Sequence, residues 1–561
     1  MSDHPTVLAA AFDALGRGDV GLAESLCRQG LSQRDDGELH AVVGMAAYAE
    51  DRYPEARHAW ETAFRCLVRD GMQARAARVA TMLAELCWDG LGRQATGRGW
   101  LERARRLLED LGPCVEWGYW ELARLACDRT DVEALAASAD RALEIARAFD
   151  EPALHVRALA DGGVALVSSG AVARGLAQLD EALAFIAAGE VNDPVVLGTA
   201  FCALLTAAER VGDVDRVSEW TDTVRELMLE PSGGRPVVLR SHCSIALGGV
   251  LVHAGRWAEA EELLTSSLAG RGPARASHRV DAVARLASLR VLQGRVDAAA
   301  ELIAPYEDRL AVAVPLSAVH LARGEPALAS AVAQKALDQL VGDTLRCAPL
   351  LLSLVDAAVA AGDPEGAGVA ARRLRAMVEP AESAVVKAMA ALAEGRAALA
   401  ASDEAAAHHF EVAIRALETG ERPDLWAAAH LDLARAHRAG GHRERAIASA
   451  RAGHAAAVRL GAAPLRDHAA SVLRGLGASP PRAAPDRAVA MRDLTARERE
   501  VLGGLRRGET NAQIAAQLFL SPKTVEHHVS RLLQKLGARS RAEAAALAAS
   551  TDTLEGVRGQ E

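Results

Sequence analysis

The feature that most restricts the fold of this chain is a repeated spacing of small and apolar residues. Four well-separated windows place such residues at the same relative offsets of 0, 12, 16 and 19. A short polar break, such as Glu50-Asp51-Arg52, lies between offsets 0 and 12 in each window. The four windows are Gly44, Ala56, Trp60 and Ala63; Gly163, Gly175, Leu179 and Ala182; Gly248, Ala260, Leu264 and Ser267; and Ala434, Ala446, Ala450 and Gly453.

This spacing indicates pairs of packed helices. The small residue at offset 0 lies on a first helix where a second helix crosses it, and the residue at offset 12 is its partner on the second helix. Offsets 16 and 19 continue the buried stripe of the second helix at i+4 and i+7. The polar break is the turn between the two helices, so the chain is predicted to contain repeated helical hairpins.

The repeat resembles the tetratricopeptide family, whose unit is about 34 residues. The match is good in the four windows and degenerate elsewhere, for example at Ala287, Ala299 and Ile303. Within a repeat region of residues 1–477, this period implies roughly a dozen to fourteen helix pairs. The resemblance also implies a right-handed solenoid whose concave face binds a partner. Residues 230–236, which contain two prolines and two glycines, predict a long loop or a seam between two halves of the solenoid.

Composition supports an all-α fold. Hydrophobic residues make up 50% of the chain but aromatic residues only 3%. Alanine, which supplies much of the apolar count, has the highest helix propensity. A β-sandwich would instead favour β-branched and aromatic side chains. A length of 561 residues is too great for a single core and indicates several units or a repeat array.

The cysteines and apolar segments indicate a protein of the cytoplasm. None of the eight cysteines forms a C-x-x-C pair, so we expect reduced, buried thiols rather than disulfides or a zinc site. The N-terminus lacks the basic and apolar segments of a signal peptide. The longest apolar stretch of the sequence is expected at Leu310–Ala322. It contains Pro315 and His320 and is too short to span a bilayer. We therefore expect a soluble protein without membrane contact.

Charge is distributed unevenly along the chain. The net charge is −10, yet basic residues outnumber acidic ones between Leu494 and Ser550. A basic segment on an acidic chain is expected if only that end meets phosphate. Residues 478–493 contain three prolines and lack apolar periodicity, which predicts a semi-extended linker. Residues 551–561 are expected to form a flexible tail.

Capping residues divide 494–550 into four predicted helices. Each begins at a Ser or Thr whose hydroxyl can cap the first turn, and glycine ends two of them. The predicted caps and ends are Thr495 with Glu498 and Gly508; Thr510 with Gln513; Ser521 with Pro522 and Gly537; and Ser540 with Glu543. The short turn Phe519-Leu520 joins the second and third helices, which is helix-turn-helix geometry.

The third of these helices, residues 522–536, has two distinct faces. Its predicted buried face is Val525, Val529, Leu532 or Leu533, and Leu536. Its predicted exposed face is Lys523, Glu526, His527, Ser530, Arg531 and Gln534. A recognition helix enters the major groove of DNA with its N-terminal residues at the base edges. The helix N-terminus, with Ser521, Lys523 and Thr524, is suited to hold a phosphate.

This segment resembles the LuxR-type DNA-binding domain over about fifty-five residues, nearly without gaps. The shared features are the run from Leu494 to Leu502, Gly508, Asn511, Ile514-Ala515, Leu518, Ser521, Thr524-Val525, His528, Lys535-Leu536-Gly537 and Ser540-Arg541. The resemblance implies a homodimer paired through the fourth helix, a roughly palindromic operator in double-stranded DNA, and regulation of transcription, more often activation, with RNA polymerase as a partner.

The resemblance also implies a set of DNA-binding residues. Base-reading positions fall on Glu526, His527 and Ser530, and Arg531 is a further candidate. Many relatives carry a lysine where this chain has Glu526 or Ser530, so the resemblance does not define the operator sequence, and weaker non-specific attraction to phosphate is expected. The full expected set is Thr510, Asn511, Gln513, Ser521, Lys523, Thr524, Glu526, His527, His528, Ser530, Arg531 and Lys535. Arg506 and Arg507 either contact phosphate or compensate the dipole at the end of the first helix.

The whole arrangement resembles the large LuxR-type regulators, which place an ATPase and similar repeats before the DNA-binding domain. A Walker A loop needs Gly-Lys-Ser/Thr, but none of the four lysines follows a glycine, so no ATPase is expected. Gly16–Gly21 fits G-x-G-x-x-G by letter, but no strand precedes it. Neither His408-His409 nor His527-His528 can chelate a metal as a pair, since adjacent helical residues point about 100° apart. No cofactor is expected.

We therefore interpret the chain as a bacterial, cytoplasmic transcription regulator, associated with the nucleoid when bound to DNA. Its solenoid would receive a protein, peptide or small-molecule signal and so control the DNA-binding dimer. No α/β receiver domain is indicated, because the required strand alternation is absent. An alternative is a repeat-based adaptor whose C-terminal domain only dimerises. No residue lies in a recognisable catalytic context, so an enzyme is not expected. Trp60, Trp100, Trp220 and Trp257 are expected to fill the core rather than form a ligand cage.

Overall fold

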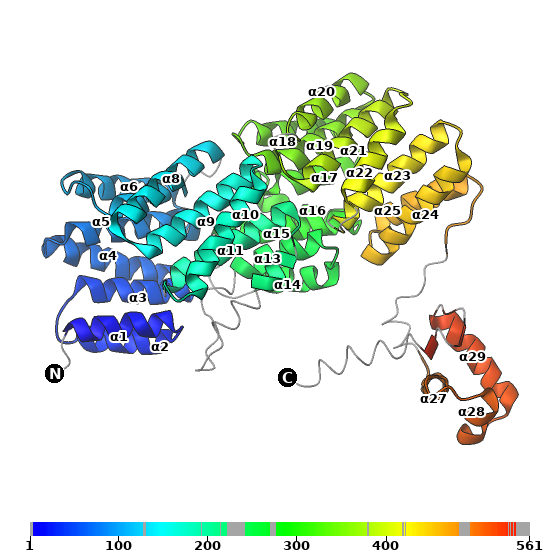
Figure 1. Cartoon of the computed structure of the whole chain (residues 1–561), viewed down its shortest axis with the longest axis horizontal. Coiled ribbons are helices and arrows are strands. Elements are labelled where there is room, and N and C mark those ends of the chain that lie inside the picture. Colours follow the sequence, from blue (N-terminus) through cyan, green and yellow to red (C-terminus); the bar gives the residue numbers. More distant parts are fainter. Residues whose placement is uncertain are drawn as a thin grey trace. The chain divides into compact units, whose positions relative to one another are not determined.

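The computed structural model divides the chain into two compact units, Met1–Pro480, here called the body, and Pro481–Glu561, here called the C-terminal unit. The described residues are 4–126, 131–191, 193–213, 215–220, 242–269, 276–378, 381–417, 420, 422–481, 494–536, 538, 540–541 and 544–545. Every regular element among them is helical, apart from one isolated bridge between Asp131 and Val341, so the predicted all-α class is confirmed (Figure 1).

Among the described residues, the body consists of helices, and most consecutive helices are joined by short turns. Its first half contains α1 (His4–Gly16), α2 (Val20–Leu31), α3 (Gly37–Ala49), α4 (Tyr53–Arg69), α5 (Gln73–Glu85), the π-helical turn η1 (Leu86–Gly90), α6 (Gln94–Glu109), α7 (Glu116–Ala126), α8 (Val132–Phe149), α9 (Pro152–Ser169), α10 (Val172–Ala187) and α11 (Pro194–Val211). Its second half contains α13 (His242–His253), α14 (Trp257–Ala269), α15 (Ala276–Leu292), α16 (Val296–Ile303), η3 (Ala304–Tyr306), η4 (Leu310–Val312), α17 (Ala313–Ala322), α18 (Pro326–Leu337), α19 (Thr344–Ala361), α20 (Pro364–Arg375), α21 (Ala384–Ala400), α22 (Ala406–Ala416), α23 (Pro423–Ala439), α24 (Arg443–Leu460) and α25 (Ala463–Gly475).

The four sequence windows correspond to the pairs α3/α4, α9/α10, α13/α14 and α23/α24, and consecutive helices stack along the body (Figure 1). Glycines at the crossing points allow each close approach. A Cβ atom on Gly44 would overlap the Trp60 ring, and a Cβ atom on Gly163 would lie 2.9 Å from the carbonyl oxygen of Gly175. The predicted contact of offsets 0, 12 and 16 is therefore confirmed, and the body is a tetratricopeptide-like α-solenoid.

The tryptophan prediction is confirmed where burial is nearly complete. Trp60 and Trp257 are 2% and 3% exposed, and the Trp60 indole Nε1 donates to the Ala41 carbonyl oxygen at 3.1 Å. Trp100 is half-buried with its ring edge-on to Phe64. These side chains fill space between helices, as their large apolar area favours.

The row of helix pairs curls back on itself, so that segments far apart in the chain make contact. The amide of Val132 donates to the carbonyl of Val341 at 3.1 Å, and the amide of Glu382 donates to the carbonyl of Gly170 at 3.1 Å. Helix α9 packs beside α19 in the same way. These contacts join successive turns of the solenoid and enclose its concave side.

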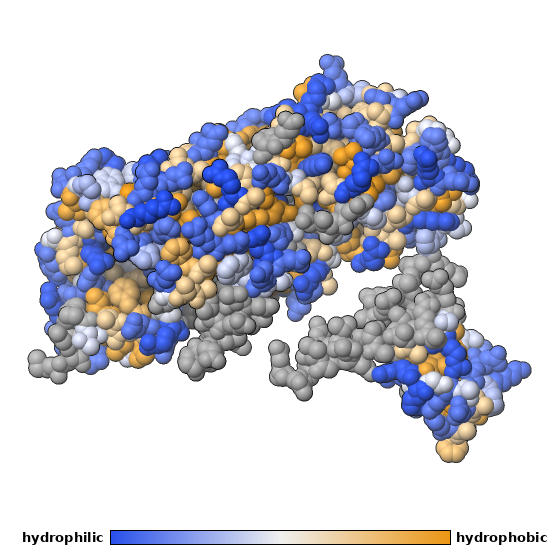
Figure 2. All heavy atoms as spheres, viewed as in Figure 1, coloured by the Kyte–Doolittle hydropathy of each residue, from blue (hydrophilic) through white to orange (hydrophobic). Residues whose placement is uncertain are grey.

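One helix corrects the expectation about apolar stretches. Among the described residues, α19 is long and apolar enough to cross a membrane by length and composition, so the stretch Leu310–Ala322 is not the longest. The charged residues Arg346 and Asp356 interrupt the apolar run of this helix, so the sequence does not show it as one long apolar stretch. In the structure 44% of the helix is buried, and it packs against α18, α20 and α21 as a core helix of the body. On the face in view, hydrophilic side chains are interspersed along the whole body (Figure 2).

The C-terminal unit contains α27 (Ala496–Arg506), α28 (Asn511–Leu518) and α29 (Pro522–Leu536). Its core includes Leu494, Val501, Leu505, Ile514, Val525 and Leu532. Several predicted features lie outside the described residues: the loop or seam at 230–236, most of the linker, Gly537, the fourth helix opened by Ser540 with Glu543, and the tail 551–561.

Candidate functional site

The predicted caps hold α27, α28 and α29 in place. Thr495 with Glu498, and Thr510 with Gln513, each form a complete capping box in which side chain and backbone bond reciprocally. The Ser521 hydroxyl accepts a hydrogen bond from the Thr524 amide at 3.1 Å. Gly508 has a φ of 76°, the left-handed conformation that ends α27 at little cost. The predicted starts of α27, α28 and α29 are therefore confirmed.

Helix α29 has the two faces that its sequence predicts. Val525 and Leu532 are fully buried, and Val529 and Leu533 are half-buried against the same core. The opposite face is exposed at Lys523, Glu526, His527, Ser530 and Arg531. The side chains of Gln534, Lys535 and Leu536 lie outside the described residues. A polar helical face of mixed charge therefore points away from the core.

The turn between α28 and α29 places an aromatic side chain in solvent. Phe519 has a φ of 54° and is 95% exposed, which is unusual for a large apolar residue. The Arg497 guanidinium donates to the Leu518 carbonyl at 2.6 Å and so fixes the end of α28. Sequence reasoning located the turn but missed both the exposure of Phe519 and the role of Arg497, since no local pattern indicates either.

A polar network ties the α27–α28 connection together. Arg507 donates to the Glu509 carboxylate at 2.8 Å, and Gln517 donates to the same carboxylate at 2.9 Å. Arg541 donates to the Glu509 carbonyl oxygen. The hydrogen bonds from Arg507 and Gln517 lower the pKa of the Glu509 carboxyl. Arg507 is therefore held by a neighbouring carboxylate, a contact that the sequence alternatives of phosphate binding and dipole compensation did not include.

The remaining predicted DNA-binding residues lie at the start of α28 and on one side of α29. Thr510 and Gln513 bond each other within the capping box. The Oδ1 atom of Asn511 is buried and has no hydrogen-bond partner among the described residues. His528 is half-buried. The structure thus brings Ser521 and Thr524 into direct contact, whereas Thr510 and Gln513 already serve a structural role.

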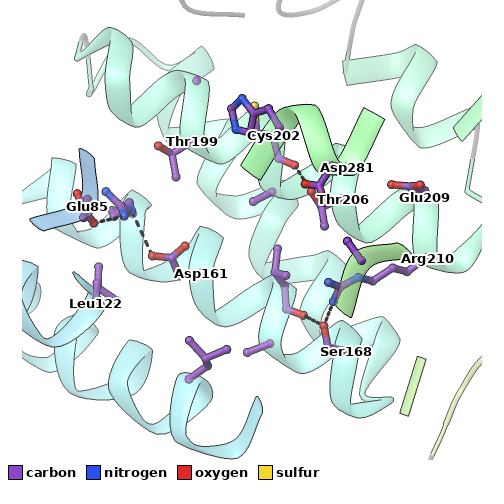
Figure 3. A pocket seen from close by; sticks show the side chains of 18 of the residues that line it. Glu85, Leu122, Asp161, Ser168, Thr199, Cys202, Thr206, Glu209, Arg210 and Asp281 are labelled. Atoms are coloured by element: carbon purple, nitrogen blue, oxygen red, sulfur yellow. Dashed lines mark hydrogen bonds and ion pairs between the residues drawn. The ribbon is translucent and has the colours of Figure 1, made fainter. Parts of the chain in front are cut away.

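The concave side of the body encloses a channel of about 1230 Å³. Odd-numbered helices from α1 to α21 supply most of its lining, together with side chains of α4, α8 and η4, and the lining combines apolar side chains with charges of both signs. In the middle of the channel, Thr199, Cys202 and Thr206 form a stripe of small polar groups along α11, shown with their neighbours in Figure 3. Arg210, also on α11, donates a hydrogen bond from its guanidinium to the hydroxyl of Ser168 on α9.

Ion pairs join inner helices along this channel. Arg157 of α9 contacts Glu85 of α5 at 2.7 Å and Asp161 at 3.1 Å (Figure 3). Arg285 of α15 donates to Glu209 of α11 at 2.5 and 2.8 Å. Burial alone would lower the pKa of Arg285, but the carboxylates of Glu209 and Asp281 raise it.

The Glu209–Arg285 pair passes over α13 at Gly249. A Cβ atom on Gly249 would overlap the Glu209 carboxylate and would lie 2.7 Å from Arg285 Nε. The glycine therefore makes room for a charge pair that links three inner helices. Sequence reasoning missed the role of Gly249, because the residues next to a glycine in a helix do not indicate which distant side chains contact it.

The sequence comparisons with known proteins concern the C-terminal unit. Residues 492–548 match the family model described as bacterial regulatory proteins, luxR family. The spore germination protein GerE of Bacillus subtilis is 49% identical over 51 residues, which cover 9% of this chain and 69% of that protein. The DNA-binding transcriptional activator DevR/DosR of Mycobacterium tuberculosis is 54% identical over 55 residues, 10% of this chain and 25% of that protein.

The match spans only part of most relatives. The probable transcriptional regulatory protein SgaR of Hyphomicrobium methylovorum is 48% identical over 65 residues, 12% of this chain and 31% of that protein. Among solved structures, one chain of the APC/C hetero-tetramer Cut9-Hcn1 overlaps 84% of this chain and 96% of its own length, at 15% identity and a TM-score of 0.45. Yeast Tom70 overlaps the same share at a TM-score of 0.30 and 10% identity.

Proposed function

This chain belongs to the LuxR family of bacterial regulatory proteins, and we propose that it is a transcription regulator that recognises specific DNA sequences through α29. The observation that carries this proposal is the exposed polar face of α29, presented by a capped helix-turn-helix. Its relatives are named as transcriptional regulators, and we infer a non-enzymatic role for this chain as well.

On DNA, α29 would enter the major groove with its exposed face toward the bases. Glu526, His527, Ser530 and Arg531 would face base edges. Among the described residues no ion pair engages Glu526 or Arg531, so their charges remain available to a ligand.

Phosphate contacts would come from the beginning of α29. Lys523 is exposed next to the backbone amides of the first turn, where the helix dipole favours an anion. Ser521 and Thr524 would contribute hydroxyl groups at the same place. The other expected contacts are Thr510, Asn511, Gln513, His528 and Lys535, with Thr510 and Gln513 contributing through the backbone of the capped helix start.

We infer that the active form on DNA is a homodimer, that its operator is two-fold symmetric, and that it most often activates transcription together with RNA polymerase. Such a protein would work in the cytoplasm. The body would receive the signal, and the enclosed channel is the place best suited to bind an effector. Its volume of about 1230 Å³ exceeds the roughly 300–1000 Å³ of common small-molecule pockets.

Selection from a random DNA pool by the full-length protein tests the proposal. We expect enrichment of a two-fold symmetric site that is lost by the double variant H527A/R531A. A parallel selection with Pro481–Glu561, which has its own hydrophobic core, measures whether the body restrains binding. Enrichment of no sequence by either protein at low salt would contradict the proposal and favour an adaptor whose C-terminal unit only dimerises.

A further inference from the structure

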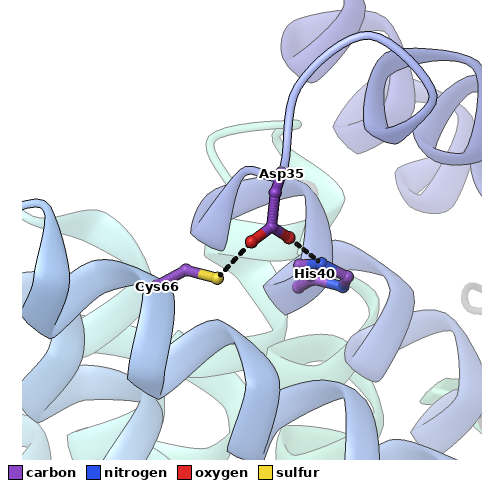
Figure 4. A group of neighbouring side chains, drawn as sticks. All are labelled: Asp35, His40 and Cys66. Atoms are coloured by element: carbon purple, nitrogen blue, oxygen red, sulfur yellow. Dashed lines mark hydrogen bonds and ion pairs between the residues drawn. The ribbon is translucent and has the colours of Figure 1, made fainter.

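Three potential metal ligands converge near the N-terminal end of the body. Asp35 precedes α3, His40 lies on α3 and Cys66 lies on α4, and the three side chains point toward one another (Figure 4). The Asp35 carboxylate lies 2.9 Å from His40 Nε2 and 3.4 Å from Cys66 Sγ. The three ligand atoms all lie within 4.8 Å of one another. The cluster is distant in sequence from the C-terminal unit and does not depend on the proposed function.

The order of the groups does not fit a nucleophilic site. In a cysteine nucleophile the imidazole must contact the thiol and remove its proton. Here the carboxylate lies between the other two groups. Burial and the hydrogen bond to Asp35 raise the pKa of the Cys66 thiol, which is the opposite of activation. The cluster therefore lacks the arrangement of a hydrolase.

We propose that Asp35, His40 and Cys66 bind a zinc ion. Thiolate, imidazole and carboxylate are the three ligand types that zinc prefers in proteins. In a tetrahedral site with bonds of about 2.0–2.3 Å, neighbouring ligand atoms lie about 3.3–3.8 Å apart. The two contacts of the Asp35 carboxylate, 2.9 Å to His40 and 3.4 Å to Cys66, lie near this range, and small side-chain rotations would bring all three ligands, now within 4.8 Å, around one ion. On binding, the Cys66 thiol releases its proton to solvent and its sulfur forms the bond to zinc. Water would complete the fourth position, because Asp35 is exposed to solvent.

One neighbouring cation competes with the metal. Arg69 donates to Asp35 Oδ2 at 3.1 Å, and it also bonds Asp70 at 2.9 Å. Arg69 is 54% exposed, so it can leave Asp35 and keep Asp70 as its partner. Removal of Arg69 should therefore strengthen metal binding.

A bound ion would join three parts of the first repeats. It would fix the loop before α3 to both α3 and α4, where Asp35 already bonds His40 and Cys66. Since the site exists only in the folded state, metal binding would stabilise the body in proportion to the logarithm of metal concentration over Kd.

Titration of the reduced full-length protein with Co²⁺ and Zn²⁺ tests this site. We expect one Co²⁺ per chain with the near-ultraviolet charge-transfer absorption of a cobalt–thiolate bond, displacement by Zn²⁺, and a rise in Tm with zinc. Cys66→Ser should abolish the absorption, whereas Cys114→Ser, a half-buried cysteine outside the cluster, should keep it. Asp35→Asn, at an exposed position, should weaken zinc binding at least about tenfold without loss of helicity.

The variant Arg69→Ala distinguishes a metal site from a cluster that is only hydrogen-bonded. It should bind zinc several-fold more tightly than the parent protein if the ion replaces the guanidinium beside Asp35. Absence of the charge-transfer absorption, equal zinc affinity in Cys66→Ser and Cys114→Ser, or weaker binding by Arg69→Ala would each overturn the proposal.

Discussion

Exposed residues on α29 are expected to contribute differently to DNA binding. Lys523 lies at the helix start, where phosphate is held, whereas His527 and Arg531 lie further along the face that meets the bases. The double variant H527A/R531A should lose about 1–3 kcal/mol of binding free energy per lost base contact on the selected operator and relax its base preference.

Lys523→Ala should weaken binding to all sequences and reduce the salt slope by about 1. Fluorescence anisotropy on operator and scrambled DNA at several salt concentrations measures both effects.

Lys387→Ala is the control for the loss of a lysine, because Lys387 is exposed on α21 in the body. It should leave affinity and salt slope unchanged. If the Lys523 and H527A/R531A variants both bound DNA as the parent protein does, the placement of α29 in the groove would be wrong.

Gly44 is predicted to be required at the crossing of α3 and α4. A methyl group there would overlap the Trp60 ring, which is itself 2% exposed and has no room to move. Gly44→Ala should therefore lower the free energy of unfolding by about 1–3 kcal/mol. Gly99→Ala, on the exposed side of α6 with no atom within 4 Å, should instead stabilise by up to about 1 kcal/mol. Urea denaturation compares the two, and equal effects would exclude steric overlap as the cause.

At the scale of elements, the sequence predicts what depends on neighbouring residues. The starts of α27 and α28 were predictable because a capping box needs only residues three positions apart. The contact of Gly163 with Gly175 was predictable because one hairpin contains both. The exposure of Phe519 was not predictable, because it depends on how α28 ends and α29 begins. The cluster of Asp35 with Cys66 was not predictable either, because it joins residues 31 positions apart.

The Glu209–Arg285 pair joins α11 to α15 and should contribute to the rigidity of the inner helices. Their side chains are only 13% and 20% exposed. Arg285→Met leaves the Glu209 carboxylate buried without its guanidinium, which should cost about 3–5 kcal/mol of unfolding free energy. The double variant E209Q/R285M should lose less than the sum of the single losses.

The matched control for this pair is Arg256→Met. Arg256 and Glu259 form an ion pair of similar distance, 2.5 Å, but both side chains are more than half exposed, at 52% and 57%. Loss of such a pair costs at most about 1 kcal/mol. Denaturant unfolding of the full chain should rank the two arginine variants in this order, and the reverse order would contradict a buried role for Arg285.

At the scale of the whole molecule, the closure of the solenoid could not be predicted from its repeats. Each pair contributes a small rotation, and only the sum decides whether distant turns meet. The bond from Glu382 to Gly170 and the bridge of Asp131 with Val341 depend on that sum. The enclosed channel follows from the same closure, so its lining was not visible in the sequence although its helices were.

The buried histidines of the body predict that acidification destabilises it. Full or partial burial lowers the pKa of five of them: His155, His253, His430, His437 and His454. In the unfolded chain a histidine has a pKa of about 6.5, so below that pH the unfolded state binds protons that the folded state does not. The contribution of these neutral histidines to the free energy of unfolding is therefore fully present above about pH 6.5. It decreases as the pH falls from that value toward their lower pKa in the folded state. The urea midpoint should decrease between pH 7.5 and pH 5.5.

His430 isolates this effect at one position. Its ring lies 4.0 Å from that of Trp426, and neither ring nitrogen has a hydrogen-bond partner among the described residues. His430→Phe keeps an aromatic ring but cannot take up a proton, so it should reduce the loss of stability between pH 7.5 and pH 5.5. His58→Gln, an exposed position on α4, should leave that loss unchanged. An unchanged loss in His430→Phe, or a urea midpoint that rises on acidification, would contradict the assignment, because a buried neutral imidazole can only oppose folding when protonated.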